Sequence, residues 1–285
     1  MKKVLVLGCN GMAGHIISLY LEENQYNVFG VARESKEMIK TFEMDVADFN
    51  ELQKIIEINK FDVIINSIGL LNQYAEVNKE KAVLLNSYLP HFLVKITENS
   101  NTKIIHLSTD CVFSGKKGDY NEDDFTDGPT FYDKSKALGE IIDNKNLTFR
   151  NSIVGPDLKS EGIGLFNWFM QQDGEIKGFN KVYWNGVTTL KLAEAIKYSI
   201  EEDITGIYHL VNDEGISKYE LLKIFNNISR NGKLIIKKSE EFKSNKMLIN
   251  NRKDFDFIVP SYNEMINDQN DWIKNHKKLY EHYNV

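Results

Sequence analysis

The sequence predicts an α/β fold in which helices cover both faces of a parallel sheet. Three observations support this prediction. Short apolar runs alternate with segments of helical periodicity through the first half of the 285 residues, as in sheets whose parallel strands are joined by helices. Some runs, such as 63–65, are continuously apolar, as expected of strands covered on both sides. A glycine-rich turn directly follows the first run. Together these features are typical of a Rossmann-type doubly wound sheet.

The expected elements follow one another in a regular order along the chain. Apolar runs predict strands at 3–7, 27–32, 62–68, 103–107 and 147–154. Helical periodicity predicts helices between them at 13–23, 48–58, 79–98 and 131–143. A helix at 188–201 and a strand at 206–211 predict a return to the sheet. Further helices are expected at 217–229, which begins with a capping box of Ser217 and Glu220, and at 262–283.

Composition limits the classes of function. The formal net charge is −6 and the pI is near 5.6, which argues against a nucleic-acid partner. Only two cysteines occur, Cys9 and Cys111, so the chain has no disulfide framework and is expected in a reducing compartment, the cytoplasm. No stretch approaches the roughly 18 to 20 apolar residues of a membrane-spanning helix. A membrane partner is therefore not expected. The six histidines show no metal-ligand spacing, so no bound metal is expected either.

Three glycines between the first strand and the first helix predict a phosphate site. Gly8, Gly11 and Gly14 are spaced Gly-x-x-Gly-x-x-Gly, with Asn10 and Met12 between them. Backbone amides in such a turn can approach a pyrophosphate, and the helix N-terminus adds a favourable dipole. The spacing differs from the usual Gly-x-Gly-x-x-Gly of the dinucleotide fingerprint. Its position after an N-terminal strand nevertheless indicates that these five residues bind a dinucleotide cofactor.

The end of the second strand indicates which dinucleotide. NAD-binding chains usually offer the ribose a carboxylate there, whereas this chain offers Arg33. A guanidinium can pair with a 2′-phosphate, so NADP(H) is preferred and NAD(H) remains possible. Alternatively, Arg33 is a solvated charge at a strand end. Asp45 and Val46 are expected near the adenine, and Ser67 and Gly69, after a later strand, are also expected to contact the cofactor.

The regular alternation of strands and helices ends near Gly155 and Pro156. The stretch that follows carries glycines and tryptophans, and the helical pattern returns at 188. The expected units are a dinucleotide-binding Rossmann domain at 1–154 plus 188–212, a smaller substrate-binding lobe at 155–187 plus 213–261, and a C-terminal helix at 262–285.

Tyr132 and Lys136 lie four residues apart in an expected helix. Residues i and i+4 share one helix face, so the Lys136 ammonium is expected to lower the pKa of the Tyr132 phenol and make it a proton donor near neutral pH. Thr109 follows the strand 103–107, at the carboxyl edge where open α/β sheets bind ligands. It can donate a hydrogen bond to a substrate carbonyl. The spacing alone also fits a solvated helix face, but beside a dinucleotide site it predicts that Thr109, Tyr132 and Lys136 are catalytic.

These motifs resemble those of the extended short-chain dehydrogenases/reductases. The resemblance is carried by the glycine turn, Asn66-Ser67-Ile68-Gly69, Asn86, Ser108-Thr109-Asp110-Cys111-Val112-Phe113 and Tyr132-x-x-x-Lys136-x-x-Gly139-Glu140. More narrowly, the last two motifs resemble the dTDP-4-dehydrorhamnose reductase branch. The likeness is specific over residues 4–155 and weak beyond 213. There Asn251-Arg252-Lys253 departs from the Arg-Pro common in the branch, which leaves the nucleotide specificity open.

The resemblance implies an NAD(P)H-dependent oxidoreductase that reduces the 4-keto group of a nucleotide-linked 4-keto-6-deoxyhexose, in the biosynthesis of deoxysugar and polysaccharide precursors. Tyr132 would protonate the developing alkoxide and Thr109 would orient the carbonyl, while Tyr132 and Lys136 would also contact the cofactor. A sugar nucleotide is the implied partner. A homodimer is possible, because the helices at 79–98 and 131–143 pair across a twofold axis in many relatives.

The expected substrate contacts are Asp110, Cys111, Val112, Arg150 and Trp184. Arg150 would contact the diphosphate, or else is a surface charge. Trp184 would stack on the base, or else fills the core of the lobe. Asn86 would support a water relay to Lys136, or else is a polar residue at an interface. Cys111 would take part in catalysis only in the alternative below, and is otherwise a small buried side chain.

Two other functions remain open. Epimerase-reductases of the GDP-fucose synthase type carry a cysteine two residues after the catalytic hydroxyl, as Cys111 follows Thr109. They also commonly use a histidine after the position of Gly155-Pro156, and no histidine lies between His106 and His209. The second alternative is a noncatalytic nucleotide-binding subunit, like the regulatory subunit of methionine adenosyltransferase. The presence of the complete catalytic set argues against it.

Overall fold

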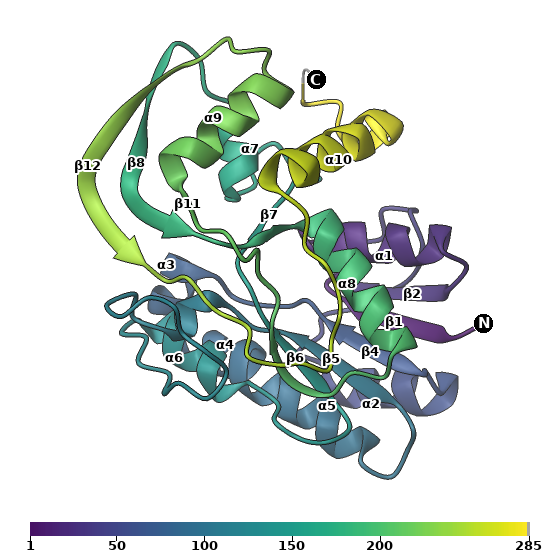
Figure 1. The fold of residues 1–285 in the computed structure, drawn as a ribbon. Helices are drawn as coiled ribbons and strands as arrows, with labels where there is room; N and C mark the ends of the chain where they lie inside the picture. The colour runs from purple at the N-terminus through teal and green to yellow at the C-terminus, as the bar shows by residue number, and fades with distance from the viewer. Residues whose placement is uncertain (284–285) are drawn as a thin grey trace.

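The computed structural model describes residues 1–283. Its centre is a seven-stranded sheet in the order β10-β6-β5-β4-β1-β2-β3, and every neighbouring pair is parallel (Figure 1). The strands are β1 (Lys3–Leu7), β2 (Asn27–Ala32), β3 (Lys40–Glu43), β4 (Val63–Asn66), β5 (Lys103–Leu107), β6 (Leu147–Arg150) and β10 (Gly206–His209). This confirms the predicted doubly wound parallel sheet.

Helices cover both faces of the sheet because its strands are apolar on both sides. In β1, Val4 and Val6 pack into one hydrophobic core and Leu5 and Leu7 into another. The first core is covered by α1 (Gly14–Glu23) and α8 (Thr189–Glu201), and the second by α2 (Phe49–Asn59) and α5 (Leu89–Thr97). The helices α3 (Asn72–Val77), α4 (Lys79–Ala82) and α6 (Phe131–Leu138) lie in the segments that follow β4 and β5.

The helix expected at 79–98 is interrupted. A π-helical turn, η1 (Val83–Tyr88), lies between α4 and α5, and the Leu89 amide donates to the carbonyl of Leu84, five residues back. Pro90 follows at once and has no amide hydrogen to continue the α-helical ladder. This turn matters for the site because it carries Asn86.

A second, smaller sheet forms the outer part of the lobe. It has the order β11-β8-β12, with β8 (Glu175–Trp184) antiparallel to β11 (Ile216–Ser217) and parallel to β12 (Ile235–Asn245). The two long strands form a curved ribbon at the edge of the molecule (Figure 1). The remaining lobe elements are α7 (Leu165–Met170), α9 (Lys218–Ser229) and the two-stranded pair β7 (Ile153–Val154) and β9 (Val187–Thr188).

The chain ends in α10 (Tyr262–Asn275) and the 3₁₀ turn η3 (Lys277–Leu279). The helix expected at 262–283 is therefore shorter, and the last two residues of the segment 262–285 lie outside the described residues. The strand expected at 147–154 is split between β6 and β7, which belong to different sheets. Within residues 1–283, no helix combines the length and the apolar character needed to cross a membrane.

Candidate active site

The turn after β1 forms a backbone cradle. Gly8 has φ +80°, a conformation that side chains rarely adopt. A Cβ on Gly14 would lie 2.1 Å from the Gly8 carbonyl oxygen, so only glycine lets α1 begin this close to the turn. The Gly11 amide closes the turn by donating to Gly8 O at 2.9 Å. Among residues 1–283, no side chain caps α1. The turn thus has the shape and the free helix end that a pyrophosphate site requires.

Side chains from neighbouring strands hold this turn in place. The Ser67 hydroxyl donates to Leu7 O at 2.6 Å, and the Asn10 amide donates to Glu34 O at 2.7 Å. The Asn10 bond ties the glycine turn to the segment after β2. Arg33 lies in that segment with its side chain exposed. The turn and Arg33 therefore lie side by side at one edge of the sheet.

The other expected cofactor residues differ in how accessible they are. Gly69 is exposed, and an added Cβ would meet only Asn86 Oδ1, at 3.8 Å. Asp45 is exposed, and its carboxylate accepts a hydrogen bond from the Ala47 amide. Val46 is buried in the core beneath α2. Met12 is half-buried against the backbone of the lobe at Gly164.

Thr109 and Tyr132 meet at the carboxyl edge of the sheet. The Thr109 hydroxyl, just after β5, donates to Asp110 Oδ1 and accepts from the Cys111 amide, both at 3.1 Å. Tyr132 is the second residue of α6, which begins with a capping box of Thr130 and Asp133. The Thr109 hydroxyl lies close enough to the phenol to lower its pKa.

The glycine turn is near this pair. Only β4 separates β5 from β1 in the sheet, so the ends of β1 and β5 lie two strand spacings apart, roughly 10 Å. Both ends face the same edge because the strands are parallel. The structure therefore brings the predicted dinucleotide cradle and the predicted catalytic hydroxyls to one edge.

Lys136 does not act on Tyr132 as expected. Its ammonium faces β5, where it donates to Leu107 O at 2.6 Å and lies 3.4 Å from His106 Nε2. The pKa of Tyr132 is raised rather than lowered, first by burial and then by Cys111, while only Thr109 lowers it. Burial lowers the pKa of Lys136 itself to about 8, and Glu140 opposes this. The expected cation effect fails because the lysine is directed into the protein.

Two lysines of the lobe approach the catalytic edge. Lys218, the first residue of α9, and Lys246, just after β12, both act electrostatically on Asp110 and Cys111. Burial lowers the pKa of Lys218 to about 8, while the acidic groups raise the pKa of Lys246 despite its burial. Burial also raises the pKa of Asp110, and that of the Cys111 thiol to about 12. The edge of the sheet and the lobe thus face each other across a group of opposite charges.

Three of the expected substrate contacts are buried within the fold, and their contact with a substrate remains a prediction. Arg150 is buried and forms a two-pronged ion pair with Glu140, with both N···O distances 2.8 Å. Trp184 packs in the main core against Tyr262 and is 3% exposed. Val112 has no exposed surface and packs in a small core cluster with Phe113 and others. Each of the three side chains thus has a structural role inside the fold.

Asn86 has a structural role. Its amide nitrogen donates to Leu70 O and Ser135 Oγ, both at 3.0 Å, and its oxygen accepts from the Leu70 amide at 2.7 Å. These bonds join η1, the segment after β4, and α6. The Asn86 side chain thus holds α6 against the segment after β4, while its expected part in a water relay to Lys136 remains a prediction.

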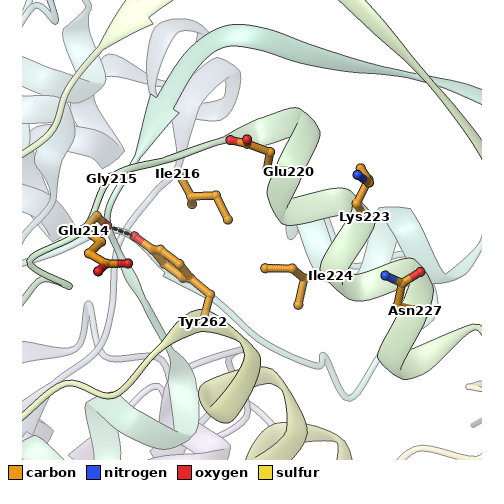
Figure 2. Close-up of a pocket in the computed structure, with 8 residues that line it drawn as sticks. All are labelled: Glu214, Gly215, Ile216, Glu220, Lys223, Ile224, Asn227 and Tyr262. Atoms are coloured by element: carbon orange, nitrogen blue, oxygen red, sulfur yellow. Dashed lines mark hydrogen bonds between the residues drawn. The ribbon is translucent and has the colours of Figure 1, made fainter.

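A cavity of about 380 Å³ lies elsewhere, in the lobe (Figure 2). Its lining residues are Glu214, Gly215, Ile216, Glu220, Lys223, Ile224, Asn227 and Tyr262. Figure 2 shows them between α9, the segment around β11 and the start of α10, with the Tyr262 hydroxyl bonded to Glu214 O. None of the predicted site residues lines it, so this cavity is separate from the candidate active site.

Sequence reasoning gave no role to four residues of this region. Lys218 and Lys246 come from the lobe, and among many scattered lysines no local pattern distinguishes them. His106 and Asn66 lie inside apolar strands, and both are fully buried. A polar residue in a continuously apolar strand was the available signal, because such a residue needs a buried partner.

The chain is similar to known proteins over most of its length. Residues 1–245 match the family described as RmlD substrate binding domain. The spore coat polysaccharide biosynthesis protein SpsK of Bacillus subtilis (strain 168) is 28% identical over 77% of either chain. The dTDP-4-dehydrorhamnose reductase of Aggregatibacter actinomycetemcomitans is 25% identical, over 77% of this chain and 76% of that one. The methionine adenosyltransferase 2 subunit beta of Xenopus tropicalis is 24% identical, over 77% and 70%.

Solved structures show the same fold. A hypothetical dTDP-4-dehydrorhamnose reductase from Sulfolobus tokodaii aligns with a TM-score of 0.78 and 27% identity, over 91% of this chain and 98% of that one. A dTDP-4-dehydrorhamnose reductase from Bacillus anthracis in complex with NADP aligns with a TM-score of 0.80 and 19% identity, over 96% and 99%. The fold is that of the extended short-chain dehydrogenases/reductases. Because the family match spans most of the chain, this protein belongs to the RmlD substrate binding domain family.

Proposed function

We propose that the protein is an NAD(P)H-dependent reductase of the 4-keto group of a nucleotide-linked 4-keto-6-deoxyhexose. The observation that carries the proposal is the placement of the buried Tyr132 phenol, which packs with Cys111 next to Thr109, about two strand spacings from the glycine turn. The reductases among its relatives support the substrate class. The NADP complex of the Bacillus anthracis structure supports a nicotinamide cofactor.

The glycine turn, Ser67 and Gly69 would hold the cofactor, and Arg33 favours the 2′-phosphate of NADP(H). The bound nicotinamide would supply a hydride to C4 of the sugar. Tyr132 then supplies the proton that the C4 oxygen requires. Burial raises the pKa of this phenol, so it keeps its proton at neutral pH and is a donor to a developing alkoxide. Thr109 would hydrogen-bond the carbonyl oxygen and fix its orientation.

The sugar nucleotide would lie between the catalytic edge and the lobe. Asp110 and Cys111 lie on one side of this region, and Lys218 and Lys246 lie on the other. Two ammonium groups would stabilise the negative charge of a diphosphate. This assignment replaces Arg150, which is already paired within the protein.

The test is NADPH oxidation with a panel of UDP-, dTDP- and GDP-linked 4-keto-6-deoxysugars, followed by mass spectrometry of the products. The proposal expects one or more substrates to gain two hydrogens, one from the cofactor and one from water. Binding of NADPH without turnover of any member of the panel would contradict it. That outcome would instead favour the noncatalytic role suggested by the similarity to methionine adenosyltransferase 2 subunit beta.

One observation favours a second candidate, reduction coupled to epimerisation. The Cys111 thiol is close to both Tyr132 and the Lys246 ammonium. Cys111 and Lys246 would serve as the second acid/base pair in a chain that has no histidine between His106 and His209. Incorporation of solvent deuterium at a carbon beside the ketone, in addition to reduction at C4, would support epimerisation. If the carbons beside the ketone carry no deuterium, the reaction is reduction without epimerisation.

A further inference from the structure

We infer that His106 is a positioning residue for Lys136, and that Asn66 fixes the proton of the His106 ring on Nε2, facing the lysine. The inference rests on the proposed function together with the catalytic role that the sequence predicts for Lys136, and it adds two residues to that site. Both lie inside strands, His106 on β5 and Asn66 on β4, with no exposed surface.

The orientation of the Asn66 amide is set by the backbone. Its Oδ1 accepts a hydrogen bond from the Ile68 amide at 3.2 Å. Its Nδ2 lies 3.2 Å from Nδ1 of His106. An amide nitrogen offers only hydrogens, so Nδ1 must be the acceptor. In a neutral imidazole, the single proton is then on Nε2.

That proton faces Lys136. Nε2 of His106 lies 3.4 Å from Nζ of Lys136, and Nζ also donates to Leu107 O at 2.6 Å. An ammonium cannot accept a hydrogen bond, whereas a neutral amine can accept one through its lone pair. An Nε2–H in this position therefore favours the amine over the ammonium. Asn66 reaches Lys136 only through this ring, because it determines which ring nitrogen carries the hydrogen.

The other ionisable groups around Lys136 do not cancel the effect of His106 on its protonation. The ionisable groups on the elements around Lys136 are Tyr132 and Glu140 on α6, His106 on β5, Asp110 on η2 (Asp110–Val112), Arg150 on β6 and His91 on α5. Glu140 favours the ammonium, but it is bound to Arg150 and accepts from Ser108. Burial and Lys136 lower the pKa of His106 well below its ordinary value, so the ring stays neutral. His106 is thus the group in direct contact with Nζ that opposes its charge.

The first test uses the whole protein without substrate, labelled with ¹⁵N in its histidines. NMR is expected to show His106 as a neutral ring protonated at Nε2 between pH 6 and 8. In Asn66→Asp, a carboxylate oxygen, which only accepts hydrogen bonds, takes the place of the donating Nδ2. The proton of the His106 ring is therefore expected to move to Nδ1. A wild-type ring protonated at Nδ1, or a charged ring, would overturn the inference. Because no turnover is needed, this result is independent of whether the proposed reductase activity exists.

The second test is the pH dependence of kcat once a substrate is found. In Asn66→Asp, Nε2 becomes an acceptor for the ammonium. The limb near pH 8 is expected to move up by about half to one pH unit, a three- to tenfold change in the ratio of the two Lys136 states. Asn267→Asp makes the same charge change at an exposed site on α10, and it is expected to leave the limb in place. Equal profiles for the two variants would overturn the inference.

Discussion

At the scale of single residues, burial decides what the site can do. The Tyr132 phenol is 7% exposed and its pKa is raised, so it enters a reaction protonated. Lys136 is 3% exposed and has a pKa lowered to about 8, so its charge changes close to neutral pH. Arg33, by contrast, is exposed beside the glycine turn. The groups expected to transfer protons are buried, and the group expected to select the cofactor is open to solvent.

The role of Arg33 can be tested by reversing its charge. Arg33→Asp is expected to weaken NADPH binding about 10- to 100-fold, because a charge-assisted hydrogen bond contributes about 1.5 to 3 kcal/mol. NADH binding should change little. Lys36→Asp makes the same charge change three residues away, and its lysine is paired with Glu34, so a smaller effect is expected. Dissociation constants from fluorescence titration would show the difference, and equal weakening of NADPH by both variants would contradict a specific role for Arg33.

The buried pair of Glu140 and Arg150 predicts a large stability effect. Their side chains are each 4% exposed and 2.8 Å apart. Glu140→Gln leaves a buried guanidinium without its counter-charge, which is expected to cost about 3 to 5 kcal/mol. Glu98→Gln, which breaks an exposed pair with Lys95, should cost under about 1 kcal/mol. Urea unfolding measures both free energies. A similar small loss in the two variants would show that Arg150 is not held by Glu140.

At the scale of elements, the site is made where strand ends meet helix starts. The glycine turn joins β1 to α1, Thr109 follows β5, and Tyr132 lies in the first turn of α6. Asn86, in the π-helical turn η1, binds the segment after β4 and α6 together. Each of these segments is anchored by backbone hydrogen bonds, so the hydroxyls and the cradle keep a fixed spacing.

The tight start of α1 predicts that Gly14 cannot be replaced. In Gly14→Ala the methyl would lie 2.1 Å from Gly8 O and 2.8 Å from Ser67 Oγ, so the turn must open. Cofactor binding is expected to fall at least tenfold, and the free energy of unfolding by about 1 to 3 kcal/mol. Gly69→Ala, whose methyl meets only Asn86 Oδ1 at 3.8 Å, should retain its stability. Thermal unfolding with and without NADPH compares the variants, and an unchanged melting temperature and NADPH shift in Gly14→Ala would refute this account of the turn.

The sequence predicted the parts of this fold that depend on local pattern. The strands of the main sheet are apolar on both sides, and the glycine turn and the Tyr132 helix carry recognisable motifs. The strands β3, β8 and β12 were not predicted. Much of β12 is charged and exposed, so it has no buried face that would give a period of two. The buried pair of Arg150 with Glu140 was not predicted for a different reason, since the two residues are brought together only by the tertiary fold. The core interpretation of Trp184 agrees with its packing against Tyr262.

At the scale of the whole molecule, the C-terminal segment contacts the first helix close to the glycine turn. Nδ1 of His15, in α1, donates to Gly11 O at 2.8 Å, and Nε2 of the neutral ring accepts from the Tyr280 hydroxyl at 2.7 Å. Tyr280 is 1% exposed. The C-terminal segment therefore supports the first helix through a buried neutral histidine. The homodimer remains a prediction, and exposed Tyr88 and Leu138 are side chains that such an interface would cover.

Buried histidines predict a loss of stability in acid. Burial lowers the pKa of His15, and that of His209, to about 4 from an ordinary 6.5. Between these values the unfolded chain binds more protons than the folded one, so the free energy of unfolding falls as the pH drops from about 6.5 to about 4. Each histidine contributes about 3 kcal/mol to this fall.

Urea unfolding as a function of pH measures the slope. His15→Gln is expected to reduce it by about one proton, and His282→Gln, at an exposed site, should leave it unchanged. An identical slope in His15→Gln and in the wild type would contradict a buried neutral His15.

The most direct measurement of the central claim compares NADPH oxidation by the wild type, Tyr132→Phe and Tyr198→Phe with a 4-keto-6-deoxysugar nucleotide. Tyr198 is a half-buried tyrosine of α8, packed between Phe255 and Phe257 and distant from the catalytic edge. Removing a general acid is expected to lower kcat about 100- to 10,000-fold in Tyr132→Phe with NADPH still bound, while Tyr198→Phe turns over like the wild type. Undiminished turnover in Tyr132→Phe would contradict the account.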